Sequence, residues 1–315
     1  MIGKVVVSYP SDVTHLANLQ ACAPGWQIVP VSSEQQARRE FVDADVVLGN
    51  PHFIQALPSA RHLKWMQSNS VGMDLLLSSE RVRAGDFLIS NARGVYDAEL
   101  ADHTLAMILS LLRGITASER NRLAGVWHRR ALVSIEGTHT LVFGYGGVGR
   151  EVCRRLRLMG GQVTAVRRQP DVEVASEVPV IGLNEGLARL PEADIVVLAL
   201  PLTAETENLF DRKNIAALPA GCFLINVSRG GLIDESALES ALDRLGGVGL
   251  DCLREEPPPS GHWAWRHPGV LLTPHVGRAP ESSTGRRFYS LFEHNLGRWA
   301  SGQLPINLID RTLGY

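Results

Sequence analysis

The sequence predicts an α/β protein built from parallel sheets that helices cover on both faces. Apolar runs typical of strands alternate with helical stretches along the whole chain. Most of these runs are continuous, as in IVVLAL at 195–200, and lack the polar–apolar alternation of a half-exposed strand. With 315 residues, the chain has room for two domains of roughly 100–200 residues each.

The predicted strands fall into two groups, one before and one after residue 98. Parallel strands need crossover connections, and the helical stretches between the runs provide them with the usual right-handed geometry. The strands are predicted at KVVVS (4–8), WQIVPV (26–31), VVLG (46–49), KWMQS (64–68), FLIS (87–90), TLVFG (140–144), QVTAV (162–166), IVVLAL (195–200), CFLINV (222–227), GVGLD (247–251) and VLLTP (270–274).

Two segments are predicted to be long helices. One is 98–123, which carries an extended apolar stripe, and the other is 281–302. About five strand–helix units precede the first helix, about six strands lie between the two, and only a short tail follows the second. This order predicts an inserted domain: residues 1–97 and 285–315 form one domain, and residues 98–284 form the other.

Composition argues against several classes of partner and site. The formal net charge of −2 gives no reason to expect a nucleic acid or an anionic membrane as a partner. No apolar run is long enough to span a bilayer. The N-terminal MIGKVVVSYP lacks the long apolar core and cleavage site of a secretory signal. The four cysteines are scattered, so we expect reduced thiols, no metal site and a cytoplasmic location.

A glycine-rich turn follows the strand predicted at 140–144. Gly144, Gly146 and Gly149 fit the pattern G-x-G-x-x-G, and the turn opens a helix that leads to a further strand. The first glycine permits the tight turn, the second lets the backbone approach a pyrophosphate, and the third permits close packing of helix on strand. The helix N-terminus offers N–H groups to the phosphates. This context indicates a dinucleotide site, although the motif alone is a weak signal.

The strand after the glycine turn ends in two arginines. An NAD-binding unit usually carries an acid about 20 residues after the turn, where it bonds the ribose 2′-hydroxyl. Here Arg167 occupies that place and Arg168 follows it. A guanidinium pairs with a 2′-phosphate, and the missing carboxylate removes a repulsion. We therefore expect NADP to be favoured and NAD to remain possible; the alternative is two solvated arginines with no cofactor preference.

Polar residues follow three of the later apolar strands. Arg229, Asp251, Glu256 and His275 lie in the segments VSRGGLIDESAL, GLDCLREEPPP and LLTPHVG. Ligands of open α/β sheets gather at the carboxyl ends of the strands. Hydride transfer to a 2-keto acid needs a cation for the carboxylate and ketone, and a proton donor that titrates near neutral pH, a role that suits histidine. A carboxylate beside the histidine favours its charged form.

The motifs taken together resemble those of the D-isomer-specific 2-hydroxyacid dehydrogenase family, in its glyoxylate/hydroxypyruvate reductase-like branch. The resemblance covers nearly the whole chain. It implies two Rossmann-like, doubly wound domains, with the nucleotide-binding domain inserted into a flavodoxin-like substrate domain. The motifs are LKWMQSNSVGMDLL (63–76), NARGVYDAELADHTLAMILSLLR (91–113), GYGGVG (144–149), ADIVVLALPLTAETENLF (193–210), INVSRGGLIDESAL (225–238), GLDCLREEP (249–257) and LLTPHVG (271–277).

The resemblance also implies roles for particular residues. The family's catalytic arginine, glutamate and histidine fall on Arg229, Glu256 and His275. The substrate would meet Arg229, His275 and the backbone N–H groups of Ser70, Val71 and Gly72, and Asp251 would contact the nicotinamide amide. Cofactor binding is implied for Gly144, Tyr145, Gly146, Gly147, Val148, Gly149, Arg167, Arg168, Leu200, Pro201, Val227, Ser228 and Asp251.

The resemblance further implies a homodimer, with the 98–123 helix as the dimer element, unless its apolar stripe packs on the core. His103 lies on that stripe and is expected to be structural. Two other functions stay open. One is an NAD-linked reductase of a bulkier 2-keto acid, with a pocket shaped by Trp127, Trp263 and Trp265. The other is a nucleotide-sensing, corepressor-like binding protein with negligible turnover.

Overall fold

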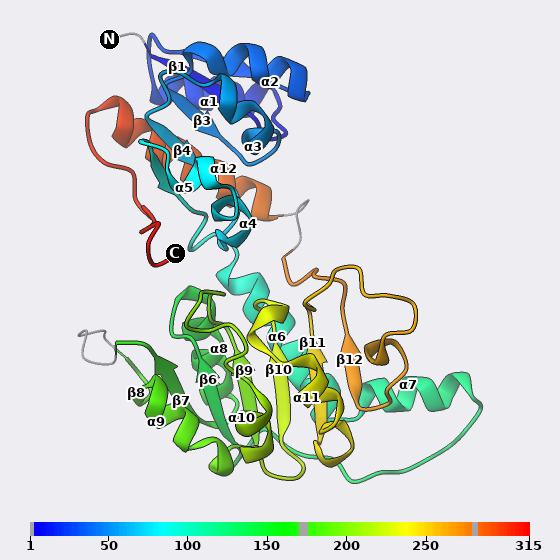
Figure 1. The fold of residues 1–315 in the computed structure, drawn as a ribbon. Coiled ribbons are helices and arrows are strands. Elements are labelled where there is room, and N and C mark those ends of the chain that lie inside the picture. Colours follow the sequence, from blue (N-terminus) through cyan, green and yellow to red (C-terminus); the bar gives the residue numbers. More distant parts are fainter. Residues whose placement is uncertain (1–2, 170–175, 279–282) are drawn as a thin grey trace. The chain divides into compact units, whose positions relative to one another are not determined.

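The chain folds into two compact units, each with its own parallel sheet (Figure 1). The computed structural model describes residues 3–169, 176–278 and 283–315. Unit 1 comprises Met1–Tyr96 with Pro280–Tyr315, and unit 2 comprises Asp97–Ala279. The predicted α/β class with two parallel, helix-covered sheets is confirmed.

The sheet of unit 1 has the order β2-β1-β3-β4-β5, and all of its pairs are parallel. This is the order of a flavodoxin-like doubly wound sheet, in which the winding reverses between β1 and β3. The strands are β1 (Lys4–Val7), β2 (Gln27–Pro30), β3 (Val46–Leu48), β4 (Trp65–Gln67) and β5 (Leu88–Ser90). The helices are α1 (Val13–Cys22), α2 (Glu34–Glu40), α3 (Phe53–Ala56), α4 (Asp74–Leu77), α5 (Glu80–Arg83) and α12 (Ser283–Ala300).

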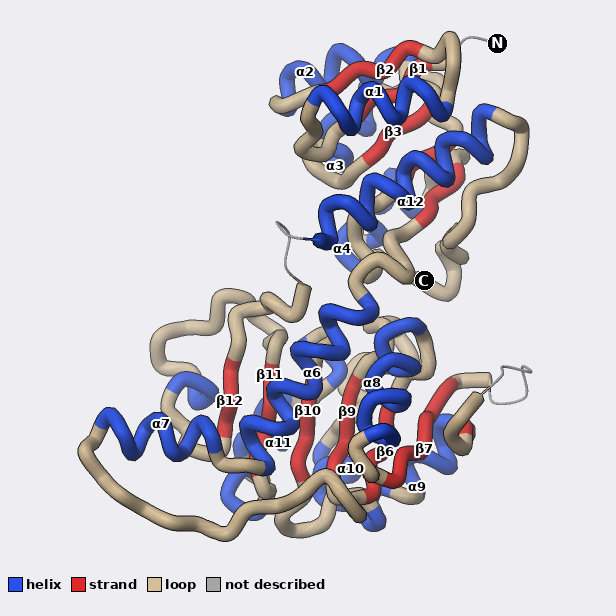
Figure 2. Tube along the Cα trace, turned by 180° about the vertical axis from the view of Figure 1, so that it is seen from behind, coloured by secondary structure: helices blue, strands red, loops and turns tan. Residues whose placement is uncertain are grey.

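The last helix of the chain completes the first sheet. α12 lies beside α1 (Figure 2), and its Trp299 ring lies 5.7 Å from the Trp65 ring in β4. Asn295 donates through Nδ2 to Oε1 of Gln67 at 2.7 Å, with both side chains fully buried. The predicted helix at 281–302 therefore exists, although its residues 281 and 282 lie outside the described residues.

The sheet of unit 2 is also parallel, in the order β12-β11-β10-β9-β6-β7-β8. Its winding reverses between β6 and β9, as in a dinucleotide-binding doubly wound sheet. Strand β8 was missed by the sequence analysis because it is three half-buried residues that end in a glycine. The strands are β6 (His139–Phe143), β7 (Gln162–Arg167), β8 (Val180–Gly182), β9 (Ile195–Leu198), β10 (Phe223–Asn226), β11 (Gly247–Leu250) and β12 (Val270–Leu272).

Helices cover both faces of this second sheet, as the two opposite views show (Figures 1 and 2). One core cluster joins Phe143, Leu198 and Leu224 to residues of α10 and α11. A second cluster joins the alternate strand residues, such as Val142 and Val197, to residues of α6 and α8. Alternate residues of a strand point to opposite faces, which explains the continuous apolar runs. The helices are α6 (Asp97–Leu112), α7 (Ile115–Leu123), α8 (Gly147–Leu158), α9 (Leu183–Ala188), α10 (Arg212–Ala217) and α11 (Glu235–Glu239).

The prediction of a single helix at 98–123 is wrong. It is two helices, α6 and α7, separated at Gly114, which has a left-handed backbone with φ +61°. The apolar stripe of α6 buries residues such as Met107 and Ile108 against the sheet, whereas α7 buries none of its side chains. A glycine that ends one helix and starts another gives no signal of its own inside an apolar stripe.

Several predicted strands are too long at their carboxyl ends. The run IVVLAL was predicted as a strand to residue 200, but β9 ends at Leu198. Similarly, β10 ends at Asn226 and β12 at Leu272. The apolar runs continue past the last ladder pair because these first loop residues are still partly or fully buried. The residues just beyond the strands therefore belong to loops at the edge of the sheet.

Candidate active site

The register of the second sheet brings its strand ends to one level. Phe143 pairs with Leu198, Leu198 with Asn226, and Asn226 with Leu250. Leu250 pairs with Leu272 in turn. Residues that follow these partners therefore leave the sheet at the same edge: Gly144, Ala199, Val227, Asp251 and Thr273. The predicted site residues of this unit come from these loops.

The glycine-rich turn has the geometry that a dinucleotide requires. Gly144 has φ +106°, and a Cβ there would lie 2.3 Å from the carbonyl oxygen of Ala199. A Cβ on Gly149 would lie 1.8 Å from the carbonyl oxygen of Gly144, so the helix packs directly on the turn. A Cβ on Gly146 would meet nothing within 4 Å. The middle glycine thus leaves open space in front of the N-terminus of α8, where a phosphate would bind.

Arg167 stands level with the glycine turn, because its neighbour Val166 pairs with Phe143. Among the described residues, its buried Nη1 has no hydrogen-bond partner, although a buried donor normally has one. Arg168 lies 3.7 Å from a carboxylate oxygen of Glu205 and is half-exposed. An orphaned guanidinium N–H beside the turn fits a cofactor that brings an additional anionic group.

Two further loops with predicted cofactor residues lie beside the turn. The Ser228 hydroxyl donates to the carbonyl of Leu200, which ties the loop after β10 to the loop after β9. The Thr206 hydroxyl donates to the carbonyl of Pro201 at 2.7 Å and closes the second loop on itself. Val227 is the first residue beyond β10. Tyr145 donates to or accepts from Ser176, with 2.8 Å between their oxygens.

A close backbone contact fixes the position of Arg229. A Cβ on the following residue, Gly230, would lie 1.9 Å from the carbonyl carbon of Leu253, so only glycine fits where these two loops cross. Asn226 holds the backbone carbonyl of Arg229 at 2.9 Å, and the guanidinium Nη1 donates to the carbonyl of Ser228 at 2.8 Å. The loop that carries Arg229 is thereby packed against the loop that carries Glu256.

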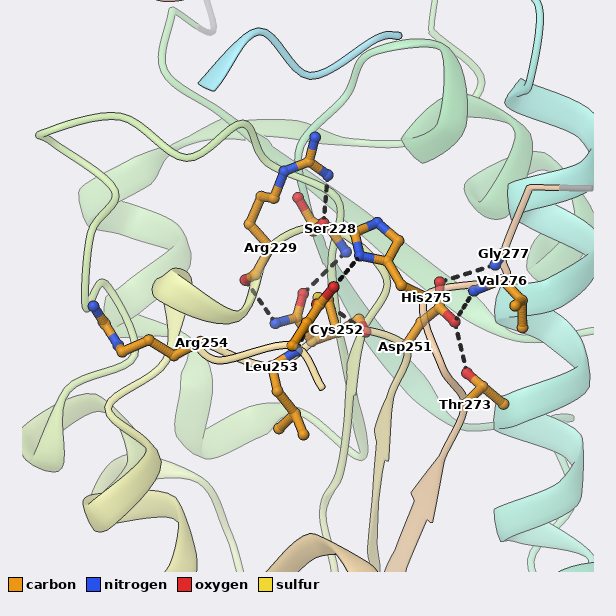
Figure 3. Close-up of polar contacts among 12 residues, drawn as sticks. Ser228, Arg229, Asp251, Cys252, Leu253, Arg254, Thr273, His275, Val276 and Gly277 are labelled. Atoms are coloured by element: carbon orange, nitrogen blue, oxygen red, sulfur yellow. Dashed lines mark hydrogen bonds and ion pairs between the residues drawn. The ribbon is translucent and has the colours of Figure 1, made fainter. Parts of the chain in front are cut away.

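His275 and Glu256 form a direct pair. His275 Nδ1 lies 2.8 Å from Oε2 of Glu256, and Oε1 of the same carboxylate accepts the Leu253 N–H at 3.0 Å. The two side chains keep 41% and 38% of their surface exposed, so both remain accessible to a ligand. The pair directs the imidazole so that Nε2 is its free atom within the described part of the chain. Figure 3 shows His275 and Arg229 at the same end of the sheet.

Asp251 is not exposed at this edge. Its side chain is 2% exposed, and both oxygens are engaged within the protein. Oδ1 accepts the Thr273 hydroxyl at 2.7 Å and the Val276 N–H at 2.9 Å, and Oδ2 accepts the Gly277 N–H at 3.0 Å (Figure 3). Burial alone would raise the pKa of this carboxyl, but the hydrogen bonds outweigh it and hold the pKa below its usual range.

Sequence reasoning missed two members of this network. His103 of α6 lies 3.1 Å from the Thr273 hydroxyl and 3.3 Å from the carboxylate of Asp251, through Nε2. The expectation for His103 was a structural residue on an apolar stripe, which gave no hint of its neighbours. Thr273 stands two residues before His275 in the LLTPHVG segment, and that nearness was the only available signal.

The predicted substrate segment lies at the carboxyl edge of the first sheet. Ser70 donates its N–H to the Ser68 hydroxyl at 3.0 Å, and its carbonyl accepts from Ala92 at 3.0 Å. In the described part of the chain, the N–H groups of Val71 and Gly72 donate to no protein acceptor. Asn69 and Asn50 bond to each other's backbone N–H at 2.7 and 3.2 Å, an arrangement that sequence reasoning also missed.

Two of the three tryptophans of the bulkier-pocket alternative have contacts within unit 2, whereas Trp127 is 92% exposed. Trp263 packs against a core cluster of unit 2. Trp265 donates to the carbonyl of Pro259 at 3.0 Å and is 53% exposed. All four cysteines are free thiols, three of them buried. Over residues 3–169, 176–278 and 283–315, no helix is both long and apolar enough to cross a membrane, and no metal-binding group of three His, Cys, Asp or Glu side chains occurs.

Comparison with known families gives one match over most of unit 2. Residues 105–277 match the model described as D-isomer specific 2-hydroxyacid dehydrogenase, NAD binding domain. The chain is 34% identical to the (S)-sulfolactate dehydrogenase of Chromohalobacter salexigens, over 69% of this chain and 71% of that protein. It is 28% identical to the glyoxylate reductase of Thermococcus litoralis, over 82% of this chain and 80% of that protein.

Solved structures match the whole chain. A D-isomer specific 2-hydroxyacid dehydrogenase from Xanthobacter autotrophicus Py2, in complex with NADPH and MES, is 25% identical with a TM-score of 0.83, and the match covers 100% of both chains. By contrast, the matches to two phosphoglycerate dehydrogenases span 32% and 42% of those longer proteins.

Proposed function

The chain belongs to the D-isomer specific 2-hydroxyacid dehydrogenases, which are NAD(P)-dependent oxidoreductases, and from this premise we propose that it reduces a small 2-keto acid to a D-2-hydroxy acid with NADPH. Glyoxylate and hydroxypyruvate have the size that we propose for the substrate. The observation that carries the proposal is the 2.8 Å contact between His275 and Glu256, at the sheet edge that also holds Arg229 and the glycine turn.

His275 is the proposed proton donor. Its Nδ1 is held by Glu256, so Nε2 gives the proton to the ketone oxygen during reduction. The negative charge of Glu256 stabilises the imidazolium before transfer and fixes the ring in one orientation. The bound nicotinamide cofactor would supply the hydride. Arg229 polarises the ketone and holds the carboxylate of the acid.

Neutral donors complete the proposed substrate site. The backbone N–H groups of Val71 and Gly72 lack protein acceptors in the described residues, so a substrate carboxylate would find them available. Ser70 contributes through its place in the same loop, since its own N–H is bonded to Ser68. The missing side chain at Gly72 leaves room for close approach.

The proposed cofactor preference rests on Arg167 and Arg168. Arg167 has a buried Nη1 without a protein acceptor among the described residues, and both guanidiniums replace the usual acid at this place. A 2′-phosphate would satisfy the guanidinium with a charge-assisted hydrogen bond. The rest of the dinucleotide would lie along residues 144–149 and the loops that hold Leu200, Pro201, Val227 and Ser228.

We further propose a cytoplasmic homodimer whose partners are small acids and neither nucleic acid nor membrane. The dimer surface would be α7 and the segment that follows it, not α6. Six large apolar side chains are exposed there, with Trp127 at 92% and Leu123 at 73%: Ile115, Leu123, Val126, Trp127, Leu132 and Val133. An exposed apolar surface of this extent is typical of a protein interface. Sedimentation of the purified protein and of Trp127→Ser tests this surface.

The proposal is tested by turnover. The purified protein is assayed with glyoxylate, hydroxypyruvate and larger 2-keto acids, each with NADPH and with NADH. The proposal expects the highest kcat/KM for a small acid with NADPH. Preference for NADH, or for a bulky acid, would support the alternative reductase. Tight cofactor binding without turnover of any acid would support a nucleotide-sensing protein instead.

A further inference from the structure

We propose that His103 is a positioning residue for the reaction: it holds the loop of His275 in place through Asp251 and Thr273. The inference rests on the proposed role of His275, and it adds a residue on α6, outside the loops that carry the proposed chemistry. Nε2 of His103 lies 3.1 Å from the Thr273 hydroxyl and 3.3 Å from the Asp251 carboxylate.

The network holds the loop on both sides of His275. Thr273, two residues before the histidine, donates to Asp251 at 2.7 Å. Val276 and Gly277, directly after it, donate their backbone N–H groups to the same carboxylate at 2.9 and 3.0 Å. His275 itself has φ +52°, a left-handed conformation that a non-glycine residue adopts only when its surroundings impose it. The buried carboxylate is thus the anchor of the strained residue.

Counting protons assigns the role of His103. The ionised carboxylate of Asp251 can only accept hydrogen bonds, and the single proton of the Thr273 hydroxyl is already donated to it. The hydroxyl oxygen can therefore only accept from His103. Nε2 of His103 must carry a hydrogen, shared between the hydroxyl and the carboxylate. Removing this hydrogen leaves the buried carboxylate short of a donor, and the loop loses part of its anchor.

The loop after His275 packs closely against α6. A Cβ on Gly277 would lie 2.8 Å from the Asp251 carboxylate, 2.8 Å from Leu100 and 3.3 Å from the His103 ring. Helix α6 therefore packs directly against the loop, with glycine as the only residue that fits. A displaced His103 side chain would change the loop itself and with it the direction of the His275 ring.

The test compares three substitutions with a matched control. His103→Leu removes the N–H at similar volume, and His103→Gln keeps an N–H at about the position of Nε2. His139→Leu is the control, because His139 is in the same unit and also contacts a threonine hydroxyl, that of Thr164, at 3.2 Å. Thr273→Val breaks the same link from the other side and serves if His103→Leu does not fold.

Two measurements are made on each variant. Amide hydrogen exchange over residues 273–278 reports the loop without any need for turnover, and steady-state reduction reports the chemistry. We expect His103→Leu to speed exchange of this segment by about tenfold or more. We expect kcat to fall by about 10- to 100-fold with KM for the cofactor nearly unchanged, because the proton donor is misplaced. His103→Gln should restore both.

The outcomes separate a positioning role from a structural one. If His103 has only a structural role, His103→Leu and His139→Leu should both lower the melting temperature. In both variants, kcat and the exchange rate of residues 273–278 should then stay as in the unmodified protein. That result, or failure of His103→Gln to restore what His103→Leu loses, overturns the inference. If the unmodified protein turns over no 2-keto acid, the proposed function fails, whereas the exchange comparison still decides whether His103 holds the loop.

Discussion

The loops at the carboxyl ends of the two sheets differ in the polar side chains that they carry. In the loops beyond the strands of unit 1, the residues nearest the sheet are uncharged: Ser8, Gly49, Asn50, Ser68, Asn69 and Asn91. Asp12, His52 and Arg93 lie further along these loops. The loops beyond the strands of unit 2 carry ionisable residues: Arg168, Arg229, Asp251, Glu256 and His275. Both edges belong to doubly wound parallel sheets, so the difference comes from the side chains and not from the topology.

The difference suggests a division of labour. Charged groups that exchange or stabilise protons act on the reaction barrier, whereas neutral donors bind the substrate and the transition state about equally well. We therefore expect substitutions at the unit 2 edge to lower kcat and substitutions at the unit 1 edge to raise KM. Substitutions at His275 and Asn69 test this division, and substitutions at Asp251 and Arg167 test two other properties of the unit 2 edge.

The largest effect is expected at His275. His275→Asn keeps a residue that tolerates the left-handed backbone but removes the proton donor. Reductive kcat should fall by about 10³-fold, which is about 4 kcal/mol of barrier. The measurement is steady-state reduction of glyoxylate with NADPH. Full activity in His275→Asn would show that the histidine is not the proton donor.

The second effect is on stability and concerns Asp251. Its folded pKa lies below the unfolded value, so the ionised carboxylate favours the folded state. The contribution is fully present above the unfolded pKa and is lost as the pH falls through the folded pKa. Asp251→Asn should lower the free energy of unfolding by about 3 kcal/mol at pH 7. In urea titrations, this deficit should shrink below about pH 4; a deficit that does not depend on pH would contradict the assignment.

The third effect is on cofactor choice. Arg167→Asp replaces the orphaned guanidinium by a carboxylate, which repels a 2′-phosphate and accepts from a 2′-hydroxyl. The ratio of kcat/KM for NADPH to that for NADH should fall by about 10- to 30-fold, or about 2 kcal/mol. Arg189→Asp is the matched control, since Arg189 pairs with Glu192 away from this edge. If the ratio changes equally in both variants, the cause is the altered net charge and not a contact between Arg167 and the cofactor.

The smallest effect is expected in unit 1. Asn69→Ala removes the acceptor for the Asn50 N–H at 2.7 Å and loosens the loop that carries Val71 and Gly72. KM for the 2-keto acid should rise by about fivefold, or about 1 kcal/mol, with kcat nearly unchanged. Asn18→Ala, which loses an exposed contact with Glu293, is the control. A fall in kcat as large as that expected for His275→Asn would contradict the proposal that the unit 1 edge affects KM and the unit 2 edge affects kcat.

Much of the fold could be predicted from strand-like runs alone. Both faces of each sheet are buried, so successive strand residues are apolar on both sides. The sequence therefore shows these strands as continuous apolar runs. The break at Gly114 could not be predicted, because the apolar stripe continues across it and only the backbone angle differs. Strand β8 gave no signal because a three-residue edge strand needs little apolar surface.

The candidate site was predictable to the extent that it follows strand ends. Arg229, Glu256 and His275 each lie just beyond an apolar run, and parallel strands bring such residues to one edge. The 2.8 Å pair between Glu256 and His275 depends on how two loops fold back, which no local pattern encodes. The partners of Asp251 were hidden for a related reason, since His103 is far from it in the chain and lies in a helix with an apolar stripe.

The split of unit 1 along the chain has a consequence for synthesis on the ribosome. All five strands of its sheet lie between residues 1 and 96, yet Trp65 and Gln67 are covered by α12, which is synthesised only after unit 2. The growing chain therefore exposes an unfinished apolar face while the whole of unit 2 is being translated. All strands of unit 2 are synthesised before α12, so unit 2 can fold before unit 1 is complete. Chaperones would therefore be needed chiefly for the N-terminal segment of unit 1.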